Sequence, residues 1–433
     1  MDTELTIRRH FDKSDEKQYL ETPFTVPENV ESIDFTVIYQ RKESVAVGAF
    51  YFCDDINVLD FSVKNSRDEH IGSAAAVRTH IIVNGTRSSD GFVSAPVKAG
   101  QWKIVTGTYM VAPQGVDVEY KIVFTYKERR VLKGDLHCHT TASDGRHAKG
   151  TLIACAQEEG LDFLCITDHH NYAENSYKQK YSGITVIPGM EWTNYCGHVG
   201  MLGLTEPYTG TFCTNTHEDT LELIKKAREA GAVIILNHPC ASEADLRWAL
   251  DSGCCDCIEV INGPMRAAQE RTVDIWHDML CRGERIAAAG GSDYHRQSPL
   301  RGIGVPCTCA VSMSNEAEDI LTAVKNGNTY LSFSPSGPAL ELDCEGKTFG
   351  QAAREGATVR FAFSELHSRD TIYLITDKEC EQIDCPEASG KATAVIERSY
   401  KNRRFVRVQV RRAWNGSGKP ELALLSNPLY FDT

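Results

Sequence analysis

Residues 131–139, VLKGDLHCH, lead an apolar segment directly into two histidines. The same arrangement recurs in residues 163–170, FLCITDHH, and in residues 184–191, ITVIPGME, where an apolar run ends at histidine or carboxylate side chains. Short apolar runs of this kind are typical of buried strands. In a parallel α/β fold the carboxyl ends of such strands meet on one face, so these stretches predict both the fold and a polar site on that face.

Helical stretches separate the apolar runs between residues 131 and 335. Residues 147–160, 217–231 and 265–283 are amphipathic, and each stretch ends at a glycine. Glycine is the residue that most often follows the last turn of a helix. Alternation of strands and helices over about 200 residues predicts a parallel α/β architecture, for which a closed barrel is as natural as an open sheet.

The flanking regions have a different pattern. Residues 1–130 contain segments rich in β-branched and aromatic residues, such as SIDFTVIYQ and VDVEYKIVFTY, with little helical periodicity. Residues 336–433 return to this pattern, for example in ATVRFAFSEL. Alternation with a period of two is typical of half-buried strands. The sequence therefore predicts three domains: a β-sandwich in residues 1–130, an α/β domain in residues 131–335 and a second β-sandwich in residues 336–433.

The composition limits the classes of function. The formal charge is −13, from 46 basic and 59 acidic residues among 433. A chain of this charge is not expected to have a general affinity for nucleic-acid backbones or anionic membranes. The first residues lack the apolar core of a signal peptide, and no run is long and apolar enough to cross a membrane. We interpret most of the sixteen scattered cysteines as reduced thiols, and the expected location is cytoplasmic.

Metal-ligating residue types concentrate between His137 and His295, where ten of the fourteen histidines lie. Taken singly, Asp144 in a turn or His169 beside an apolar run also suits a purely structural role. Their joint occurrence at the ends of nearly all the buried strands favours a metal site instead. The candidate metal ligands are His137, His139, Asp144, His169, Glu191, His198, His238, Asp293 and His295.

The types and spacing of these residues indicate which ions they prefer. His137 and His139 lie two residues apart on an expected strand and therefore face the same side, where both can reach one metal. Nine donors exceed the roughly four ligands of a single zinc ion, which predicts a site for two to three divalent ions. Zinc, manganese and iron accept mixed imidazole and carboxylate sets, whereas calcium and magnesium disfavour so much imidazole.

Other catalytic templates find less support. The chain has no GxSxG or GxxxxGK[ST] motif and no GxGxxG after a strand, which argues against an esterase triad, a P-loop and a dinucleotide site. Cys138 lies between two candidate ligands and is expected to point away from their face. Cys254, Cys255 and Cys257 lack the spacing of a zinc knuckle.

The pieces GDLHCHTTASDG, ITDHHN, PGMEWT, GHVGMLGL, NHP, IEVING and GSDYH, in this order, resemble the PHP (polymerase and histidinol phosphatase) family of metal-dependent hydrolases. The resemblance covers residues 131–335 and implies a distorted (β/α)7 barrel with a trinuclear metal site. Some members of the family have a histidine at the position of Asp144. The aspartate in this chain is similar to the phosphoesterase-type branch. The two flanking β domains resemble the CehA/McbA-like, carbaryl-hydrolase-like branch, which includes an enzyme that cleaves carbamate esters.

The resemblance also implies how the ligands divide among the ions. One ion would be held by His137, His139, Glu191 and Asp293. Glu191 would bridge to a second ion completed by His198 and His238, and a third ion would be held by Asp144, His169 and His295. The expected reaction is hydrolysis, in which the ions lower the pKa of a bridging water and the resulting hydroxide attacks phosphorus or an acyl carbon.

Residues beside the ligand set have expected secondary roles. Asp168 and His170 are expected to orient ligands or to transfer protons. Arg296 and Arg301 are candidates to clamp a phosphate, although exposed surface positions suit them equally. Asn262 is expected to line the pocket or, equally, to form a turn.

The predicted function is hydrolysis of a small-molecule phosphate monoester or diester. A carboxylic or carbamate ester hydrolase with the same site is one alternative, and a metal-containing binding module without turnover is another. The sequence leaves the substrate, the physiological metal and the oligomeric state open.

Overall fold

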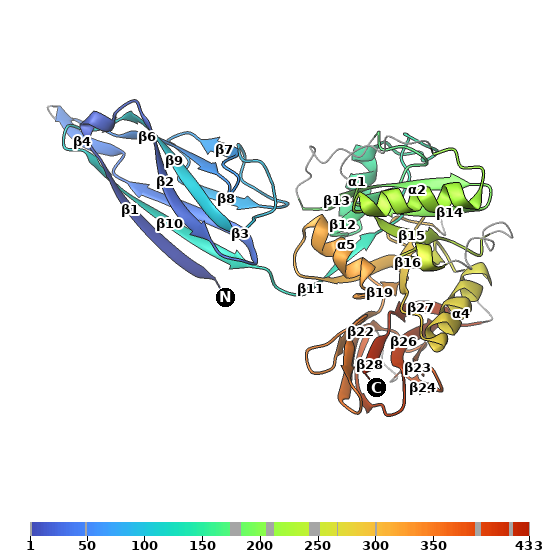
Figure 1. Cartoon of the computed structure of the whole chain (residues 1–433). Helices are drawn as coiled ribbons and strands as arrows, with labels where there is room; N and C mark the ends of the chain where they lie inside the picture. Colours follow the sequence, from blue (N-terminus) through green and yellow to red (C-terminus); the bar gives the residue numbers. More distant parts are fainter. Residues whose placement is uncertain are drawn as a thin grey trace. The chain divides into compact units, whose positions relative to one another are not determined.

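The computed structural model describes residues 2–47, 50–173, 183–204, 212–241, 252–265, 267–298, 301–385, 391–414 and 419–432 (Figure 1). The chain divides into two compact units, of which the first ends at Glu128 and the second begins at Arg129. Among the described residues, no helix is long and apolar enough to cross a bilayer. All sixteen cysteines are free thiols.

The first unit consists of two four-stranded antiparallel sheets and a hairpin. Alternating residues of the strands are buried, and those of both sheets belong to one hydrophobic core. The rings of Phe35 and Phe61, from different sheets, lie 5.6 Å apart in this core. The first sheet has the order β1 (Thr3–Phe11), β10 (Val116–Tyr126), β3 (Val30–Tyr39) and β8 (His80–Asn84). The second has the order β2 (Tyr19–Val26), β9 (Gly100–Met110), β6 (Val58–Lys64) and β7 (His70–Ala74), and the hairpin consists of β4 (Lys42–Val47) and β5 (Phe50–Asp55).

The second unit begins with a series of seven strands that are neighbours in sequence order within one sheet. The apolar runs within residues 131–139, 163–170 and 184–191 all form strands here, as predicted. Most neighbours pair in parallel, but β14 pairs antiparallel with both β13 and β15, so the sheet is mixed rather than wholly parallel. The strands are β11 (Arg130–Asp135), β12 (Phe163–Ile166), β13 (Thr185–Asn194), β14 (Gly197–Leu202), β15 (Val233–Asn237), β16 (Cys257–Asn262) and β17 (Ala287–Gly291).

The two ends of this strand series approach each other beyond the strands. Cys138 and Tyr294 form an isolated parallel bridge, and the N–H of His139 donates to the carbonyl of Tyr294 at 2.9 Å. Among the described residues, however, β11 pairs along its length with β12 and with β18 (Cys307–Ser312), not with β17. The mixed α/β fold is therefore confirmed, while full closure of the expected distorted (β/α)7 barrel stays a prediction.

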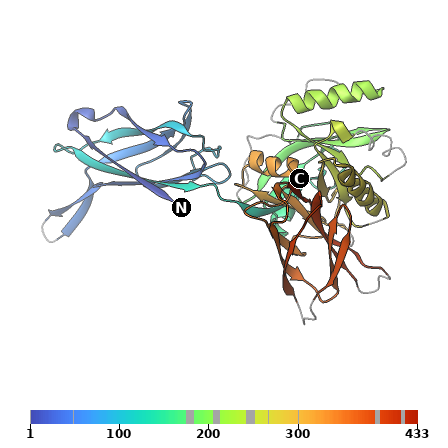
Figure 2. The ribbon, with the colours of Figure 1, turned by 60° about the horizontal axis from the view of Figure 1, so that its bottom comes forward.

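Helices follow several of these strands. Helices α1, α2 and α4 end close to Gly160, Gly231 and Gly283, and each of these glycines has a positive φ, as the sequence predicted. The hydroxyl of Thr216 caps α2 by accepting the N–H of Asp219 at 3.1 Å. The described helices of this unit are α1 (Lys149–Glu158), α2 (His217–Glu229), α4 (Ala267–Arg282) and α5 (Ala317–Lys325) (Figure 2).

The remaining strands extend the same sheet. β19 (Thr329–Ser332) pairs with β18 and with β27 (Glu421–Ser426), so hydrogen bonding continues past residue 336. Helix α4 packs into one core with C-terminal residues such as Phe405 and Leu425. The expected boundary near residue 336 stays a prediction, since both sides belong to one compact unit. The other strands are β20 (Ala339–Asp343), β21 (Ala352–Arg354), β22 (Thr358–Leu366), β23 (Asp370–Thr376), β24 (Cys380–Asp384), β25 (Ala392–Ser399), β26 (Phe405–Arg412) and β28 (Leu429–Asp432).

Candidate metal centre

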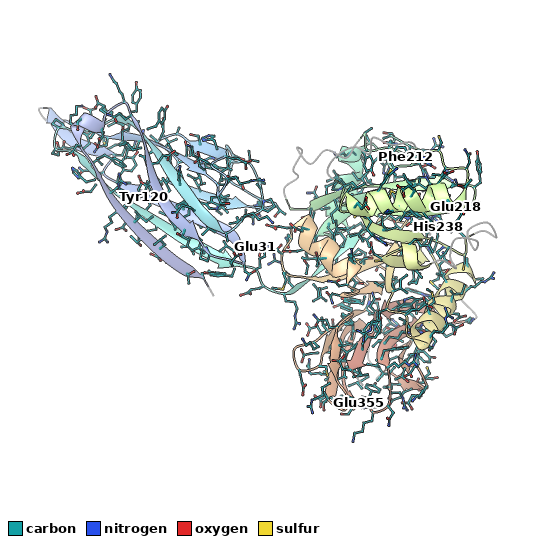
Figure 3. All side chains as sticks on the ribbon, viewed as in Figure 1. Glu31, Tyr120, Phe212, Glu218, His238 and Glu355 are labelled. Carbon is teal, nitrogen blue, oxygen red and sulfur yellow. The ribbon has the colours of Figure 1, made fainter. Side chains whose placement is uncertain are left out.

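The candidate ligands lie at the ends of the strands of the second unit. His137 and His139 follow β11, and His169 follows β12. Glu191 lies within β13 and forms an isolated parallel bridge with His169. The others are Asp144 after β11, His198 in β14, His238 directly after β15 (labelled in Figure 3), and Asp293 and His295 after β17.

The first carboxylate oxygen of Glu191, Oε1, faces β14 and β15. It lies 3.2 Å from Nδ1 of His198 and 3.2 Å from Nε2 of His238. The carboxamide of Asn237 donates to the same oxygen at 2.9 Å. Gly200, which is paired with Glu191 in register, leaves room for this carboxamide, because a Cβ there would lie 3.0 Å from Oδ1 of Asn237. The strand pairing therefore delivers two imidazoles to one oxygen.

The second carboxylate oxygen of Glu191, Oε2, faces the histidines that follow β11 and β12. It lies 3.3 Å from Nε2 of His137 and 3.4 Å from Nε2 of His139. Nδ1 of His169 lies 3.2 Å from it. Glu191 is only 1% exposed, so this carboxylate depends on its neighbours rather than on water.

Asp293 approaches the same histidines from the end of β17. Its Oδ1 lies 3.4 Å from Nε2 of His137 and 3.2 Å from Nε2 of His139. The same oxygen lies 3.4 Å from Nδ1 of His295. Asp293 has a φ of 51°, in the left-handed region that is uncommon outside glycine. Such backbone conformations concentrate at functional sites.

A third set of side chains lies nearer the surface. Oδ1 of Asp144 lies 3.6 Å from Nε2 of His169, and Oδ2 lies 3.2 Å from Nε2 of His295. Nδ1 of His139 lies 3.9 Å from the same Oδ1. The Asp144 side chain is 56% exposed, which makes this the solvent-accessible side of the cluster.

These distances fit metal ligation. Two ligands at about 2.1 Å from one ion are separated by roughly 3.0–3.4 Å in octahedral or tetrahedral geometry. The described residues contain three groups whose ligand atoms all lie within 4.8 Å of one another. His198 is in none of them, although it touches Glu191. The groups are His139, Asp144, His169 and His295; His137, Glu191 and His238; and His137, His139 and Asp293.

Unsatisfied nitrogen atoms give a second indication of fit. Nδ1 of His139 and Nδ1 of His238 are buried and have no hydrogen-bond partner among the described residues. Buried polar atoms are nearly always paired, so orphaned imidazole nitrogens in a carboxylate cluster suit a site for cations. A neutral imidazole offers one lone pair, so His139 serves only one of its two groups at a time.

The electrostatics of the cluster show its demand for positive charge. Burial raises the pKa of the Glu191 carboxyl, but His137, His198 and His238 outweigh burial and hold that pKa well below its usual range. Burial lowers the pKa of His137, but Glu191, Glu259 and Asp293 outweigh it and raise that pKa well above its usual value. The buried carboxylates therefore favour positive charge beside them, which divalent ions can supply.

Asp168 and His170 face away from the candidate ligands. The carboxylate of Asp168 is buried and accepts the N–H of Thr140 at 2.7 Å and the hydroxyl of Ser143 at 2.6 Å. Nε2 of His170 accepts the N–H of Thr193 at 2.9 Å. These contacts suit the orienting role, and proton transfer by either residue stays a prediction.

The predicted substrate-binding residues occupy two different places. Arg301 donates to the carbonyl of Asp293 at 2.8 Å, and both Arg296 and Arg301 line an open pocket of about 440 Å³. Asp144 and His295 line the same pocket. Asn262, by contrast, is buried and donates to Glu259 at 3.0 Å. The structure therefore brings the arginines, but not Asn262, into contact with this opening.

Sequence reasoning missed two buried carboxylates. Glu259 in β16 contacts His137, His238 and Asn262. Asp135 is fully buried and accepts the N–H groups of Ser292 at 2.9 Å and Gly304 at 2.7 Å, joining the end of β11 to the end of β17. A carboxylate inside an apolar run, as in CIEVIN, was the signal available for Glu259.

Comparison with protein families finds a similarity in the region that carries most of this cluster. The PHP domain model matches residues 135–252. The match contains seven of the nine candidate ligands and ends before Asp293 and His295. The site is therefore a cluster of histidines and carboxylates with groups that fit metal ions, and most of it lies in the segment that is similar to the PHP domain.

Individual relatives match less of the chain. A 5'-3' exoribonuclease of Haemophilus influenzae is 39% identical over 77 residues, which span 17% of this chain and 28% of that protein. A two-domain Bacteroides vulgatus protein containing a predicted PHP-like metal-dependent phosphoesterase has a TM-score of 0.39 at 16% identity, covering 70% of this chain and 95% of that one. An amidohydrolase from Chromobacterium violaceum has a TM-score of 0.30 at 18% identity, covering 39% and 89%. TM-scores this low do not establish a common fold.

Proposed function

We propose that this protein is a metal-dependent phosphoesterase. The observation that carries the proposal is the surroundings of Glu191, where one buried carboxylate lies within 3.4 Å of five imidazoles. A buried carboxylate needs compensating charge, and imidazole with carboxylate is a donor set that zinc, manganese and iron accept. The similarity to the PHP domain over residues 135–252 supports the same conclusion.

The donors are arranged so that three ions can be accommodated. Oε1 of Glu191 with His198 and His238 suits one ion, and Oε2 with His137, His139 and Asp293 suits a second. Glu191 would then contribute one carboxylate oxygen to each of these two sites. Asp144, His169 and His295 suit a third ion nearer the surface.

Bound divalent ions would supply a water of lowered pKa as nucleophile and would neutralise charge on the substrate oxygens. The protein's own residues hold the ligands in place. Asn237 fixes the carboxylate of Glu191 at 2.9 Å, and the hydroxyl of Thr193 lies 2.7 Å from Nδ1 of His169. The second contact leaves Nε2 of His169 directed towards Asp144. Such outer contacts keep ligands oriented before a substrate arrives.

A cationic pocket wall favours phosphate esters over neutral esters. Arg146, Arg296 and Arg301 line the pocket that also contains Asp144 and His295. A guanidinium group presents paired N–H donors that match phosphate oxygens. A phosphate bound here would meet both the arginines and the outer group of candidate ligands. We also propose that the substrate is a small molecule and that the protein is cytoplasmic.

The proposal is tested by metal analysis and a substrate panel. Purified protein loaded with Zn²⁺, Mn²⁺ or Fe²⁺ is expected to retain two to three ions per chain. It is then assayed with an aryl phosphodiester, a phosphomonoester and an aryl carboxylic or carbamate ester. Hydrolysis of a phosphate substrate is the expected result. Turnover of the aryl ester alone would assign the alternative ester hydrolase, and metal binding without any turnover would assign a binding module.

Arg296→Ala is expected to raise KM for a phosphate substrate by about tenfold with little change in kcat, because charge-assisted hydrogen bonds contribute about 1.5–3 kcal/mol. KM for a neutral aryl ester, where measurable, should not change. Arg282→Ala is the matched control, since this arginine lies at the end of α4 and pairs with Glu284. An unchanged KM for every phosphate substrate would remove Arg296 from the binding site.

A further inference from the structure

Glu259 is a buried carboxylate beside the candidate ligands that the sequence did not single out. It lies in β16 and is 3% exposed. Three donors surround it, and they come from three different segments of the chain. A carboxylate offers only acceptor positions when it is ionised, so the position of each donor is informative.

The two oxygens of Glu259 have different partners. Oε1 lies 3.0 Å from Nδ1 of His137. Oε2 accepts the backbone N–H of His238 at 3.0 Å and the carboxamide N–H of Asn262 at 3.0 Å. One side chain therefore contacts two candidate metal ligands at once.

The contact with His137 determines which ring nitrogen is free. Oε1 of Glu259 can only accept a hydrogen bond when it is ionised, so Nδ1 of His137 would carry the proton in the metal-loaded protein and Nε2 would offer its lone pair to an ion. Nε2 lies 3.3 Å from Oε2 of Glu191 and 3.4 Å from Oδ1 of Asp293. The lone pair thus points to the position where the other donors converge.

The contact with His238 acts through the backbone. His238 has a φ of 29°, outside the usual regions for a residue with a side chain. The hydrogen bond from its N–H to Glu259 stabilises this conformation, and Nε2 of its ring lies 3.2 Å from Oε1 of Glu191. Glu259 thereby positions a ligand that faces Oε1 of Glu191, whereas His137 faces Oε2.

The absence of a side chain at Gly291 leaves the space in which His137 and Glu259 contact each other. Gly291, at the end of β17, adjoins both residues. A Cβ there would lie 2.4 Å from Cβ of His137 and 3.1 Å from Oε1 of Glu259. Any side chain at residue 291 would therefore displace the hydrogen-bonded pair.

We propose that Glu259 is a positioning residue that fixes the Nδ1-protonated tautomer of His137 and the backbone of His238, so that one carboxylate prepares two ligands that face different oxygens of Glu191. The inference rests on the proposed metal centre. The role of Glu259 can be tested without an activity assay. Metal affinity and the tautomer of the His137 ring both depend on it.

Glu259→Gln is the discriminating variant. A carboxamide has one acceptor oxygen, and placing it at the Oε2 position keeps both the His238 and Asn262 hydrogen bonds. Its NH2 group then faces Nδ1 of His137, which must become the acceptor. The proton moves to Nε2 and removes the lone pair directed at Glu191 and Asp293. Since outer contacts of this kind contribute about 10–100-fold to metal affinity, we expect at least one ion to bind 10–100-fold more weakly in chelator competition.

Glu270→Gln is the control, because Glu270 is also paired with a cationic residue, Arg411 at 2.8 Å, but belongs to α4. Its metal affinity should equal that of the wild type. Wild-type protein that retains no metal would overturn the proposed metal centre itself. Wild-type protein that binds metal, with Glu259→Gln binding as many ions equally tightly, would overturn only the role of Glu259.

A measurement on the wild type covers the case in which Glu259→Gln fails to fold. Histidine labelled with 15N in the Zn²⁺-loaded protein distinguishes the two tautomers by NMR. The expected result for His137 is a proton on Nδ1. A proton on Nε2 would overturn the proposal without any variant.

Discussion

Glu191→Gln is expected to lower turnover of the metal-loaded protein by about 10³-fold or more, while the fold is retained. Outer-shell partners alone contribute about 10–100-fold, and Glu191 is proposed as a bridging ligand, so its loss should exceed that range. The neutral carboxamide removes one acceptor oxygen and the negative charge that lies within 3.4 Å of His137 and His139.

The fold should survive this change because glutamine has nearly the shape of glutamate. Asn237 can still donate to the remaining oxygen, and the pairing of β13 with β14 involves only the backbone. Circular dichroism and thermal melting check the fold, metal analysis checks occupancy, and kcat is measured with the best substrate of the panel. Activity within tenfold of wild type in a folded variant would remove Glu191 from the metal shell. Glu270→Gln serves again as the control.

The strands and their polar ends could be predicted because the information is local. An apolar run followed by histidine or carboxylate, as at Glu191 and His238, predicts a buried strand with a polar end. The glycines predict where the helices end. HxH spacing on an extended segment also predicts that His137 and His139 share a face. In the structure their Nε2 atoms lie 3.1 Å apart.

Features that depend on long-range register could not be predicted in this way. The apolar run of β14 looks like its neighbours in sequence, yet it pairs antiparallel on both sides. Hydrogen bonding between β19 and β27 joins residues that are nearly 100 positions apart, so no local pattern marks it. The sheet therefore continues across residue 336, where composition alone indicated a boundary.

The missed carboxylates have the same explanation. Glu259 and Asp135 lie in apolar strands and contact residues more than 100 positions away in the chain. Their partners are backbone N–H groups, the ring nitrogen of His137 and the carboxamide of Asn262, and this set of groups forms no spacing motif. Asp168 illustrates the reverse case: it adjoins a candidate ligand in sequence, but its side chain holds the loop at Thr140 and Ser143.

Asp293→Asn is expected to lower turnover by at least about a hundredfold, again without unfolding. Asparagine is suited to this position because it tolerates the left-handed backbone conformation, here a φ of 51°, better than other side chains. Arg301 donates to the carbonyl of Asp293 at 2.8 Å, and this contact does not require the carboxylate. The substitution therefore removes the charge of the carboxylate, which faces the histidines through Oδ1 and lies 3.5 Å from Arg301 through Oδ2, with little change in shape.

Oδ1 of Asp293 lies 3.4 Å from Nε2 of His137 and 3.2 Å from Nε2 of His139. Asp293 itself lies outside the PHP match, which ends at residue 252. Metal analysis of Asp293→Asn should show one ion fewer per chain or one ion held more weakly, with an unchanged melting profile in the presence of chelator. Asp293→Ala removes the ligand atoms and also strains the backbone, because alanine does not favour a φ of 51°. Comparison of the two variants therefore separates the loss of ligand charge from backbone strain. If Asp293→Asn kept both its full metal content and near-normal kcat, Asp293 would be removed from the proposed metal ligands, and His295 would be the one candidate ligand left beyond the matched PHP segment.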